Sequence, residues 1–339
     1  MQMSKRSQIA LYSRRLGFTR LLERMRTRRR IVVLTYHRIG DADANCYDPA
    51  VFSATAERFE RQVAYLKRNF RILTLDELLE SAARPDRVRE ACFYLTFDDG
   101  YVDNYSLAFP ILRSQEVQGT FFLPTSFIGT DRVSWWDAIA YIFRNSKQRA
   151  IHLDYPFEAT YDTRGAHWRD ELRRLLKQFK SPRTAQPARF LEQLEGACGV
   201  PLPERANLFM SWEQALEMRR AGMEMQSHAH SHEILSKLSP AAQFEELATS
   251  KRILEERLGN GCRAICYPVG GPDCFNQDTI EAARRAGYLC GFTYIGGLTT
   301  PGHVDLFRIR RLSVEANQTF DRFRFNAAAS AVSGRAVSL

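Results

Sequence analysis

Leu95-Thr96-Phe97-Asp98-Asp99-Gly100-Tyr101 is the most informative part of this sequence. It closes an apolar run that begins at Cys92 and is typical of a buried strand, and two adjacent carboxylates follow directly. Aspartates are costly to bury at the carboxyl end of a strand unless a cation or a reaction uses them. The stretch therefore predicts a functional site at the end of a buried strand. The alternative is an Asp-Gly turn that caps the following helix.

A second polar motif, Ser227-His228-Ala229-His230-Ser231-His232, follows another short strand-like run over 223–226. Two histidines and one carboxylate with open coordination positions suit a divalent metal that activates water. The second carboxylate of the first motif is then free to act as a base. His228 and His232 share a face of a helical turn, whereas His228 and His230 share a face of an extended segment.

Strand-like and helix-like segments alternate along the chain, which predicts a parallel sheet or barrel. The predicted strands are 31–36, a short one starting at 72, 92–97, 119–123, 223–226, 263–267, 288–293 and 307–313. The predicted helices are 57–70, one starting at 76, 104–115, 137–145, 168–179, 188–198, 212–221, 240–258 and 277–286.

The connection between residues 124 and 223 is far longer than an ordinary loop and contains helical patterns of its own. We expect an inserted helical subdomain over about 145–208 that leans over the barrel mouth, because long insertions are often functional lids. A decorative or oligomer-forming insertion is the alternative. Near its start, Trp136 is a candidate platform for a sugar ring, or else a core residue at a helix start.

The two motifs resemble those of the polysaccharide deacetylases of the NodB-homology type, a carbohydrate esterase family. The matching segments are T-F-D-D-G at 96–100, S-H-x-x-x-H at 227–232, T-Y-H-R-I at 35–39 and C-Y-P-V-G-G at 266–271. The T-Y-H-R-I opening marks one branch of that family. The resemblance spans about residues 31–315. It implies an α/β fold, a distorted (β/α) barrel with a helical insertion, that removes acetyl groups from N-acetylated sugars.

The resemblance also implies roles for individual residues. Asp98 is the general base, while Asp99, His228 and His232 bind one divalent metal and His230 is a bystander. This ligand set accepts zinc, cobalt, iron or nickel.

Two segments depart from the family pattern. The third motif normally carries an arginine that orients the base, and Cys266 stands in its place. The fifth motif normally supplies a histidine that protonates the leaving amine, and here only His303 lies nearby, in a turn. The acid is therefore His303 or Asp98 returning its proton. By strand alternation, Arg308 and Arg310 share one face and Arg311 takes the other, so at least one arginine points at the site.

His37 and Tyr267 are further candidates for substrate contact. His37 ends the first predicted strand, where it contacts substrate or shields the metal, or else is a hydrogen-bonded core histidine. A donor near Tyr267, together with the metal, is expected to stabilise the oxyanion.

These features predict a metal-dependent hydrolase that removes an N-acetyl or other N-acyl group from an amino sugar. The substrate is a glycan or a lipid-linked glycan precursor, as in exopolysaccharide biosynthesis. One alternative is a deformylase or small-amide hydrolase on the same barrel. Another is a degenerate barrel that only binds glycan, although the retained charged cluster argues against decay.

Charge concentrates in residues 1–30, which hold ten Lys or Arg and one Glu, equal to the net charge of +9 of the whole chain. The neutral body argues against nucleic-acid binding. The arm is amphipathic, so it either lies on an anionic membrane surface or packs on the barrel. Flotation with anionic vesicles, comparing the full chain with a version that lacks residues 1–30, distinguishes the two. We expect a barrel over 31–326 and a flexible tail over 327–339.

Arginines interrupt every apolar stretch of the N-terminus that resembles a secretory signal, and seven scattered cysteines are an odd number for a disulfide framework. A cytoplasmic protein, peripheral at the inner membrane face, is the expectation.

Overall fold

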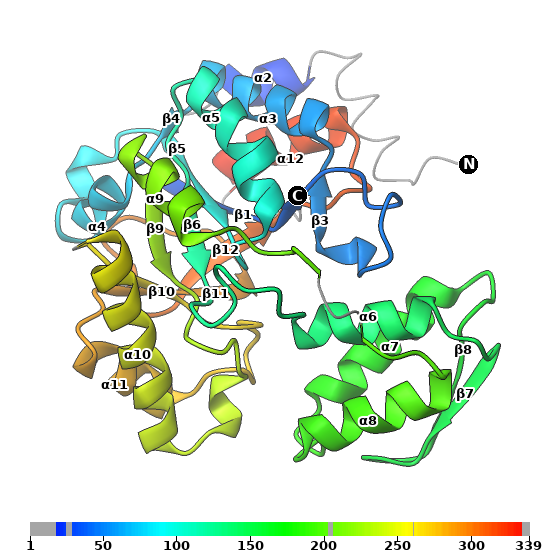
Figure 1. The fold of residues 1–339 in the computed structure, drawn as a ribbon. Coiled ribbons are helices and arrows are strands. Elements are labelled where there is room, and N and C mark those ends of the chain that lie inside the picture. Colours follow the sequence, from blue (N-terminus) through cyan, green and yellow to red (C-terminus); the bar gives the residue numbers. More distant parts are fainter. Residues whose placement is uncertain (1–17, 25–28, 203–205, 260, 334–339) are drawn as a thin grey trace. The chain divides into compact units, whose positions relative to one another are not determined.

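The computed structural model describes residues 18–24, 29–202, 206–259 and 261–333 (Figure 1). The chain divides into two compact units, each described here by itself. The first unit comprises residues 1–40, 52–129 and 209–339, and the second comprises residues 41–51 and 130–208.

The first unit is a closed barrel of seven parallel strands, as the alternating pattern predicts. The strands are β1 (Arg30–Tyr36), β5 (Ala91–Phe97), β6 (Thr120–Leu123), β9 (Glu224–Ser227), β10 (Ala264–Cys266), β11 (Cys290–Gly296) and β12 (Ile309–Ser313). Their order around the barrel is β1-β12-β11-β10-β9-β6-β5, and pairing of β5 with β1 closes it. The short β4 (Arg71–Ile72) adds to β5, and β2 (Arg38–Ile39) pairs separately with β3 (Phe52–Ala54).

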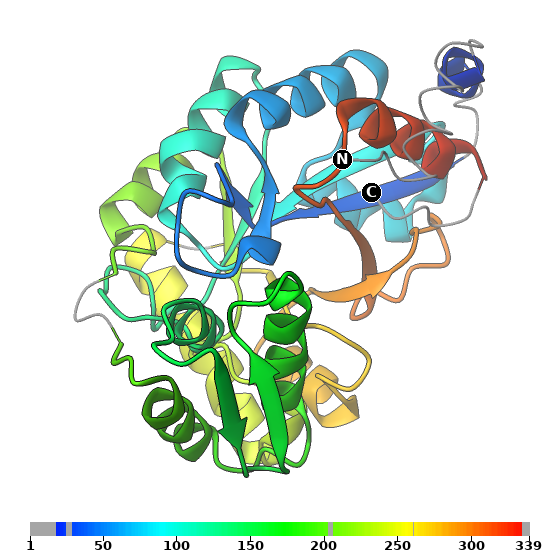
Figure 2. The ribbon, with the colours of Figure 1, turned by 90° about the vertical axis from the view of Figure 1, so that its right-hand side faces the viewer.

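Helices surround the barrel (Figures 1 and 2). They are α3 (Ala56–Asn69), α4 (Leu75–Ala83), α5 (Phe109–Ser114), α9 (Trp212–Arg220), α10 (Pro240–Leu258), α11 (Gln277–Arg285) and α12 (Phe320–Ser333), with a π-helical turn over Asn104–Ala108 before α5. Local capping fixes where several of them begin. At α10, Ser239 accepts a hydrogen bond from the backbone N–H of Ala242 and proline follows at the first helical position, a favoured helix start.

The register between β1 and β5 aligns the ends of the two strands. They pair without interruption from Arg30 opposite Ala91 to Tyr36 opposite Phe97. The Tyr36 and Phe97 rings stack at 5.3 Å, inside a fully buried apolar core. The next residue on each strand, His37 on one and Asp98 on the other, therefore emerges at the same level of the barrel mouth.

The second unit corrects the predicted insertion of 145–208. It begins at residue 130, includes the distant segment 41–51, and contains a hairpin as well as helices. Its elements are α6 (Trp135–Arg144), β7 (Ala150–Leu153), β8 (Ala159–Asp162), α7 (Trp168–Lys180) and α8 (Pro187–Cys198). The guanidinium of Arg144 donates to the backbone oxygens of Asn45 and Tyr47, both at 2.6 Å, and so binds segment 41–51 to this unit. Periodicity along the chain does not reveal such a long-range contact.

The predicted flexible tail over 327–339 is wrong for its described part. Residues 327–333 complete α12, and Ala327, Ala328 and Ala331 are fully buried. Alanine has the highest helix propensity, and its small side chain lets this helix pack closely on the barrel. Residues 334–339 lie outside the described residues.

The described part of the N-terminal arm packs against the barrel unit. Helix α2 (Phe18–Arg24) lies beside α12 (Figure 2). Glu23 receives hydrogen bonds from Arg324, at 2.6 and 2.8 Å, and from the hydroxyl of Tyr65 at 2.9 Å. For residues 18–24 the packing interpretation is confirmed, whereas residues 1–17 and 25–28 lie outside the described residues and membrane contact by the arm stays a prediction.

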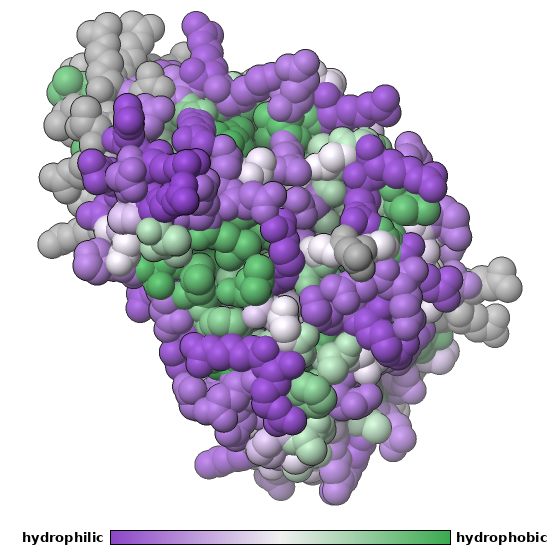
Figure 3. Space-filling view, turned by 90° about the vertical axis from the view of Figure 1, so that its left-hand side faces the viewer, coloured by the Kyte–Doolittle hydropathy of each residue, from purple (hydrophilic) through white to green (hydrophobic). Residues whose placement is uncertain are grey.

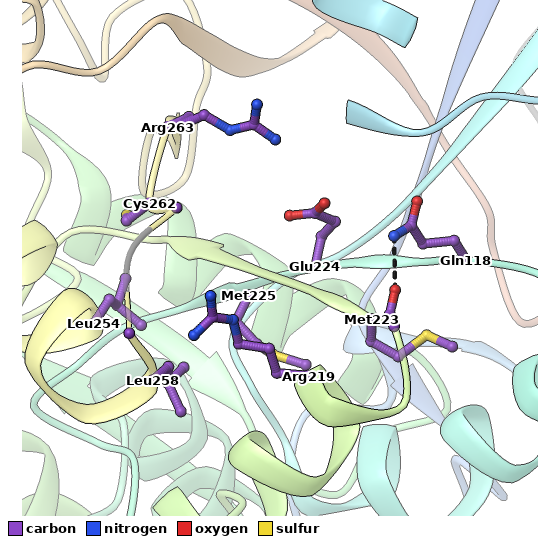
Figure 4. A pocket seen from close by; sticks show the side chains of 12 residues that line it. Gln118, Arg219, Met223, Glu224, Met225, Leu254, Leu258, Cys262 and Arg263 are labelled. Atoms are coloured by element: carbon purple, nitrogen blue, oxygen red, sulfur yellow. Dashed lines mark hydrogen bonds between the residues drawn. The ribbon is translucent and has the colours of Figure 1, made fainter. Parts of the chain in front are cut away.

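Two further features of the surface are an apolar area and a cavity. The face on the left of Figure 1 carries an apolar area among mostly hydrophilic residues (Figure 3). A cavity of about 310 Å³ lies at the amino ends of β6, β9 and β10, where Gln118, Glu224 and Arg263 line it (Figure 4). Among the described helices, none combines the length and apolar character needed to cross a membrane.

Candidate active site

Asp99, His228 and His232 meet at the carboxyl ends of β5 and β9. The Oδ1 atom of Asp99 lies 3.4 Å from Nε2 of His228 and 3.3 Å from Nε2 of His232. All three side chains are buried, and the two imidazole rings are nearly perpendicular with centroids 4.6 Å apart. The structure therefore brings together the three residues predicted to bind a metal.

The two distances from Asp99 Oδ1 fit a tetrahedral metal. Ligand atoms about 2.0–2.1 Å from a zinc-like ion lie roughly 3.3–3.4 Å from one another in that geometry. The Nδ1–H group of His228 donates to the carbonyl oxygen of Cys266 at 2.8 Å, which leaves Nε2 to face Asp99 as its ligand atom. Burial lowers the pKa of His228, but contacts with Cys266 and Asp99 outweigh burial and leave the pKa raised, so binding of a metal there displaces a proton. Burial lowers the pKa of His232, in keeping with a neutral imidazole ligand.

Asp99 is also suited to hold a cation. Burial raises the pKa of its carboxyl, but contacts with His228 and His232 outweigh that effect and leave the pKa below its usual range. The carboxylate is therefore ionised.

The backbone is strained where it carries two of the three ligands. Asp99 has φ 74° and His232 has φ 57°, while Ala229 between the histidines has φ 61°. Residues other than glycine rarely adopt this left-handed backbone conformation, which costs about 1–3 kcal/mol for each residue. Strain of this kind persists where surrounding contacts enforce it, and it is concentrated at functional sites.

Asp98 pairs with an arginine that lies 213 residues away in the sequence. Arg311 on β12 donates to both carboxylate oxygens of Asp98, at 2.8 and 2.7 Å. Its other hydrogen bonds go to the hydroxyl of Thr96, the backbone oxygen of Thr293 and the Sγ atom of Cys266. Burial raises the pKa of Asp98, but the charge and hydrogen bonds of Arg311 outweigh it, so the pKa stays below its usual range.

Arg311 also decides between two groups of potential ligands. Asp98, His228 and Cys266 lie close enough to hold an ion, as do Asp99, His228 and His232. The guanidinium already occupies both oxygens of Asp98 and lies 3.0 Å from the Cys266 sulfur, so a second cation there meets like charge. Burial raises the pKa of the Cys266 thiol, which disfavours the thiolate. The group containing Asp99 is therefore the candidate metal site.

His37 lies at the same mouth, beside Asp98. Its Nε2 atom is 3.9 Å from Oδ2 of Asp98, and 20% of its side chain is exposed. The backbone on either side is fixed, because the N–H of His37 donates to Ser53 and its carbonyl oxygen accepts from Asn104. The Tyr294 ring meets the imidazole edge-on at 5.7 Å and is 44% exposed. His37 is thus a partly exposed site residue.

Three other predicted site residues lie elsewhere or are engaged in packing. Tyr267 is buried, and its hydroxyl donates to the backbone oxygen of Phe307 at 3.0 Å, so it offers no donor to an oxyanion. His303 is exposed in a loop whose Thr299 pairs with Ile31 at the start of β1, the opposite end of the barrel from Asp98. Trp136 is 6% exposed in the apolar core of the second unit, which leaves no open ring face for a sugar.

Arg311 meets the expectation that at least one arginine of the last strand points at the site, whereas Tyr294 was not among the predicted site residues. Alternation along β12 separates Arg311 from Arg308 and Arg310, and the structure shows that the single arginine on its own face is the one that turns inward. The absence of an arginine at Cys266 was the available signal, because a buried base still needs a cation.

Replacement of Arg311 by Met is expected to lower the free energy of unfolding by about 3–5 kcal/mol, because Asp98 becomes an unpaired buried charge. Urea unfolding measures the loss. Arg310→Met, on the exposed face of the same strand, is the matched control. Adding Asp98→Asn to Arg311→Met should restore part of the stability, since no unpaired charge remains. An Arg311→Met variant as stable as the control would contradict the pairing.

Comparisons with known proteins agree with this geometry. The family model for polysaccharide deacetylases matches residues 86–291, more than half of the chain. The poly-beta-1,6-N-acetyl-D-glucosamine N-deacetylase of Staphylococcus epidermidis is 22% identical over 309 residues, which cover 86% of this chain and 80% of the relative.

Solved structures show the same fold. The Streptococcus pyogenes deacetylase PplD, in complex with acetate, has a TM-score of 0.56 at 20% identity, covering 86% of this chain and 96% of that one. IcaB from Ammonifex degensii also has a TM-score of 0.56, at 21% identity, covering 89% and 97%. The predicted deacetylase barrel is confirmed. The chain belongs to the polysaccharide deacetylase family of hydrolases.

Proposed function

We propose that this enzyme hydrolyses the N-acetyl amide of an amino sugar within a glycan, using one divalent metal bound by Asp99, His228 and His232. The observation that carries the proposal is the buried group of these three ligands beside an ionised Asp98. The Staphylococcus epidermidis relative is named for removing acetyl groups from poly-N-acetylglucosamine, which supports a substrate of that class.

When bound, the metal supplies Lewis-acid polarisation of the acyl carbonyl and lowers the pKa of water. Side chains of the protein then accept and donate the protons of the reaction. Asp98 is the base that takes a proton from the attacking water, and Arg311 keeps its carboxylate ionised and oriented.

His37 gives a proton to the departing amine. It is outside the metal group and lies at the mouth, where the amine of a bound sugar is accessible to it. Because Nε2 of His37 is 3.9 Å from Oδ2 of Asp98, the proton collected by Asp98 can return to the imidazole after a small movement. The pair thus passes one proton from water to amine and is restored at the end of each turnover.

Tyr294 offers the sugar a surface beside these groups. Its ring is exposed at the end of β11 and adjacent to His37, and aromatic faces of this kind pack against the apolar faces of sugar rings. A sugar seated there has its substituents close to Asp98 and His37. This contact replaces the one predicted for Trp136.

Acetate release from N-acetylglucosamine oligomers tests the function. We expect a chelator to abolish release and added Zn²⁺ or Co²⁺ to restore it. His37→Gln should lower kcat by about 10²–10⁴-fold, the contribution typical of a general acid. Tyr294→Ala should instead raise KM more than it lowers kcat, because it removes binding surface and no proton donor.

The same assay separates the alternatives. Release of formate from N-formyl amino sugars, with no acetate from N-acetyl ones, would identify a deformylase. Faster turnover of a short lipid-linked oligomer than of the free oligomer would support the finer proposal of a lipid-linked precursor. Chelator-resistant acetate release would refute the metal-dependent mechanism.

A further inference from the structure

We infer that Glu246 on α10 is the positioning residue that holds the histidine turn, residues 227–232, in its metal-binding conformation and so sets the metal affinity of the site. This inference rests on the metal-dependent function proposed above. It concerns a residue on the α-helix that follows the histidine turn, outside the group of three ligands.

The carboxylate of Glu246 makes three hydrogen bonds to the histidine turn. Its Oε2 atom accepts the backbone N–H groups of His230, at 3.1 Å, and of Ser231, at 2.9 Å. Its Oε1 atom accepts the hydroxyl of Ser231 at 2.7 Å. Hydrogen bonds to an ionised acceptor are roughly twice as strong as those between neutral groups. Glu246 therefore binds the turn tightly between its two metal-binding histidines.

The histidine turn needs such an anchor because its backbone is strained. Ala229 and His232 both have positive φ, on either side of the two residues that Glu246 holds. Successive backbone N–H groups beside left-handed residues form a concavity that binds anions. In this chain the anion is the Glu246 carboxylate. Without it, the two N–H groups lose their acceptor and the strained conformation loses the contacts that offset its cost.

Apart from the Asp99 carboxylate, which meets the two ligand histidines, neutral groups make further contacts with the turn. Thr125 Oγ1 lies 2.9 Å from Nδ1 of His230, and the N–H of Ser126 donates to the backbone oxygen of His230 at 2.9 Å. The hydroxyl of Ser250, one helical turn after Glu246 on α10, lies 2.8 Å from that of Ser227. The Ser250 contact holds Ser227 at the start of the turn, and the contacts with Thr125 and Ser126 hold His230. His230 therefore has a packing role.

Loss of the Glu246 carboxylate should therefore act on His232 above all. His228 directly follows β9 and keeps its bond to the Cys266 carbonyl, and Asp99 follows β5. His232 lies at the far end of the turn, beyond the two residues whose N–H groups Glu246 binds. Loss of a group that orients a metal ligand typically lowers metal affinity by about 10–100-fold.

The test measures Zn²⁺ affinity of the full chain, stripped of metal, by competition with a chromophoric chelator. Glu246→Ala should weaken Zn²⁺ binding by about 10–100-fold, and Glu246→Gln, which retains one acceptor oxygen, should weaken it less. Glu245→Ala is the matched control, because Glu245 is exposed on the same helix and its carboxylate accepts a hydrogen bond from Thr249, within that helix. It should bind Zn²⁺ as the unmodified chain does.

Thermal unfolding of the metal-free variants separates positioning from general stability. Lower melting temperatures for both Glu246 variants with unchanged Zn²⁺ affinity would show ordinary helix packing and overturn the inference. If Glu246→Ala does not fold, the Zn²⁺ affinity of Glu246→Gln decides. An unmodified chain that binds no Zn²⁺ would refute the proposed metal function itself, whereas equal affinities in the unmodified chain and both variants refute only the role of Glu246.

Discussion

Asp98→Asn is expected to lower kcat for acetate release by about 10²–10⁴-fold while the chain still binds Zn²⁺. The amide cannot accept the proton of the attacking water, and no metal ligand is altered. The carboxylate is positioned for this role by both Arg311 hydrogen bonds and by its place next to His37. Acetate release under saturating oligomer, with Zn²⁺ affinity measured in parallel, checks both halves of the expectation.

The exposed Asp86 supplies the control, since Asp86→Asn makes the same chemical change on the surface. Circular dichroism at the assay temperature verifies folding, because loss of the carboxylate also leaves Arg311 without its ionic partner. Near-normal turnover by folded Asp98→Asn would mean that the base lies elsewhere and that Asp98 serves only to neutralise Arg311.

His232→Ala is expected to remove most of the bound metal. The imidazole Nε2 lies 3.3 Å from Asp99 Oδ1, and its loss leaves two protein ligands where a catalytic site needs three. The fall in Zn²⁺ affinity should exceed the roughly 10–100-fold that loss of an outer hydrogen-bond partner costs. Elemental analysis of the purified variant and chelator competition measure it, and acetate release should disappear in step.

His230→Ala is the matched control within the same turn. Nδ1 of His230 faces Thr125, and the residue is outside the ligand group, so this variant should keep its metal. The pair of variants also distinguishes the two spacings that the sequence left open. Full metal occupancy in His232→Ala, with loss in His230→Ala, would reverse the assignment.

Much of the barrel was predictable because each strand and helix carries its own local pattern. The helix over 240–258 has the same limits in the structure as in the prediction, because the neighbouring residues Ser239 and Pro240 form a helix start that the local sequence shows. The C-terminal helix was missed for the opposite reason. Its alanines show no strong apolar periodicity, and they are buried because the helix packs against the barrel, a tertiary contact that local sequence does not reveal.

The candidate metal ligands were predictable because they follow directly after strands. Parallel strands bring their carboxyl ends to one edge, so residues that follow β5 and β9 must meet. The prediction for His303 was wrong because its loop does not stay at the carboxyl ends of the strands. After β11 the chain returns to the start of β1, where Thr299 pairs with Ile31.

The succession of strands and helices and the residues that follow each strand could thus be predicted from local sequence, and the resemblance of the motifs to those of deacetylases selected Asp98, Asp99, His228 and His232. Only the tertiary structure decided which distant side chains complete that group. Arg311 reaches Asp98 because barrel closure places β12 next to β1, and Glu246 reaches the histidine turn through the packing of α10. Local patterns encode where a strand ends, whereas the partner of a buried charge depends on the register and closure of strands far apart in the chain.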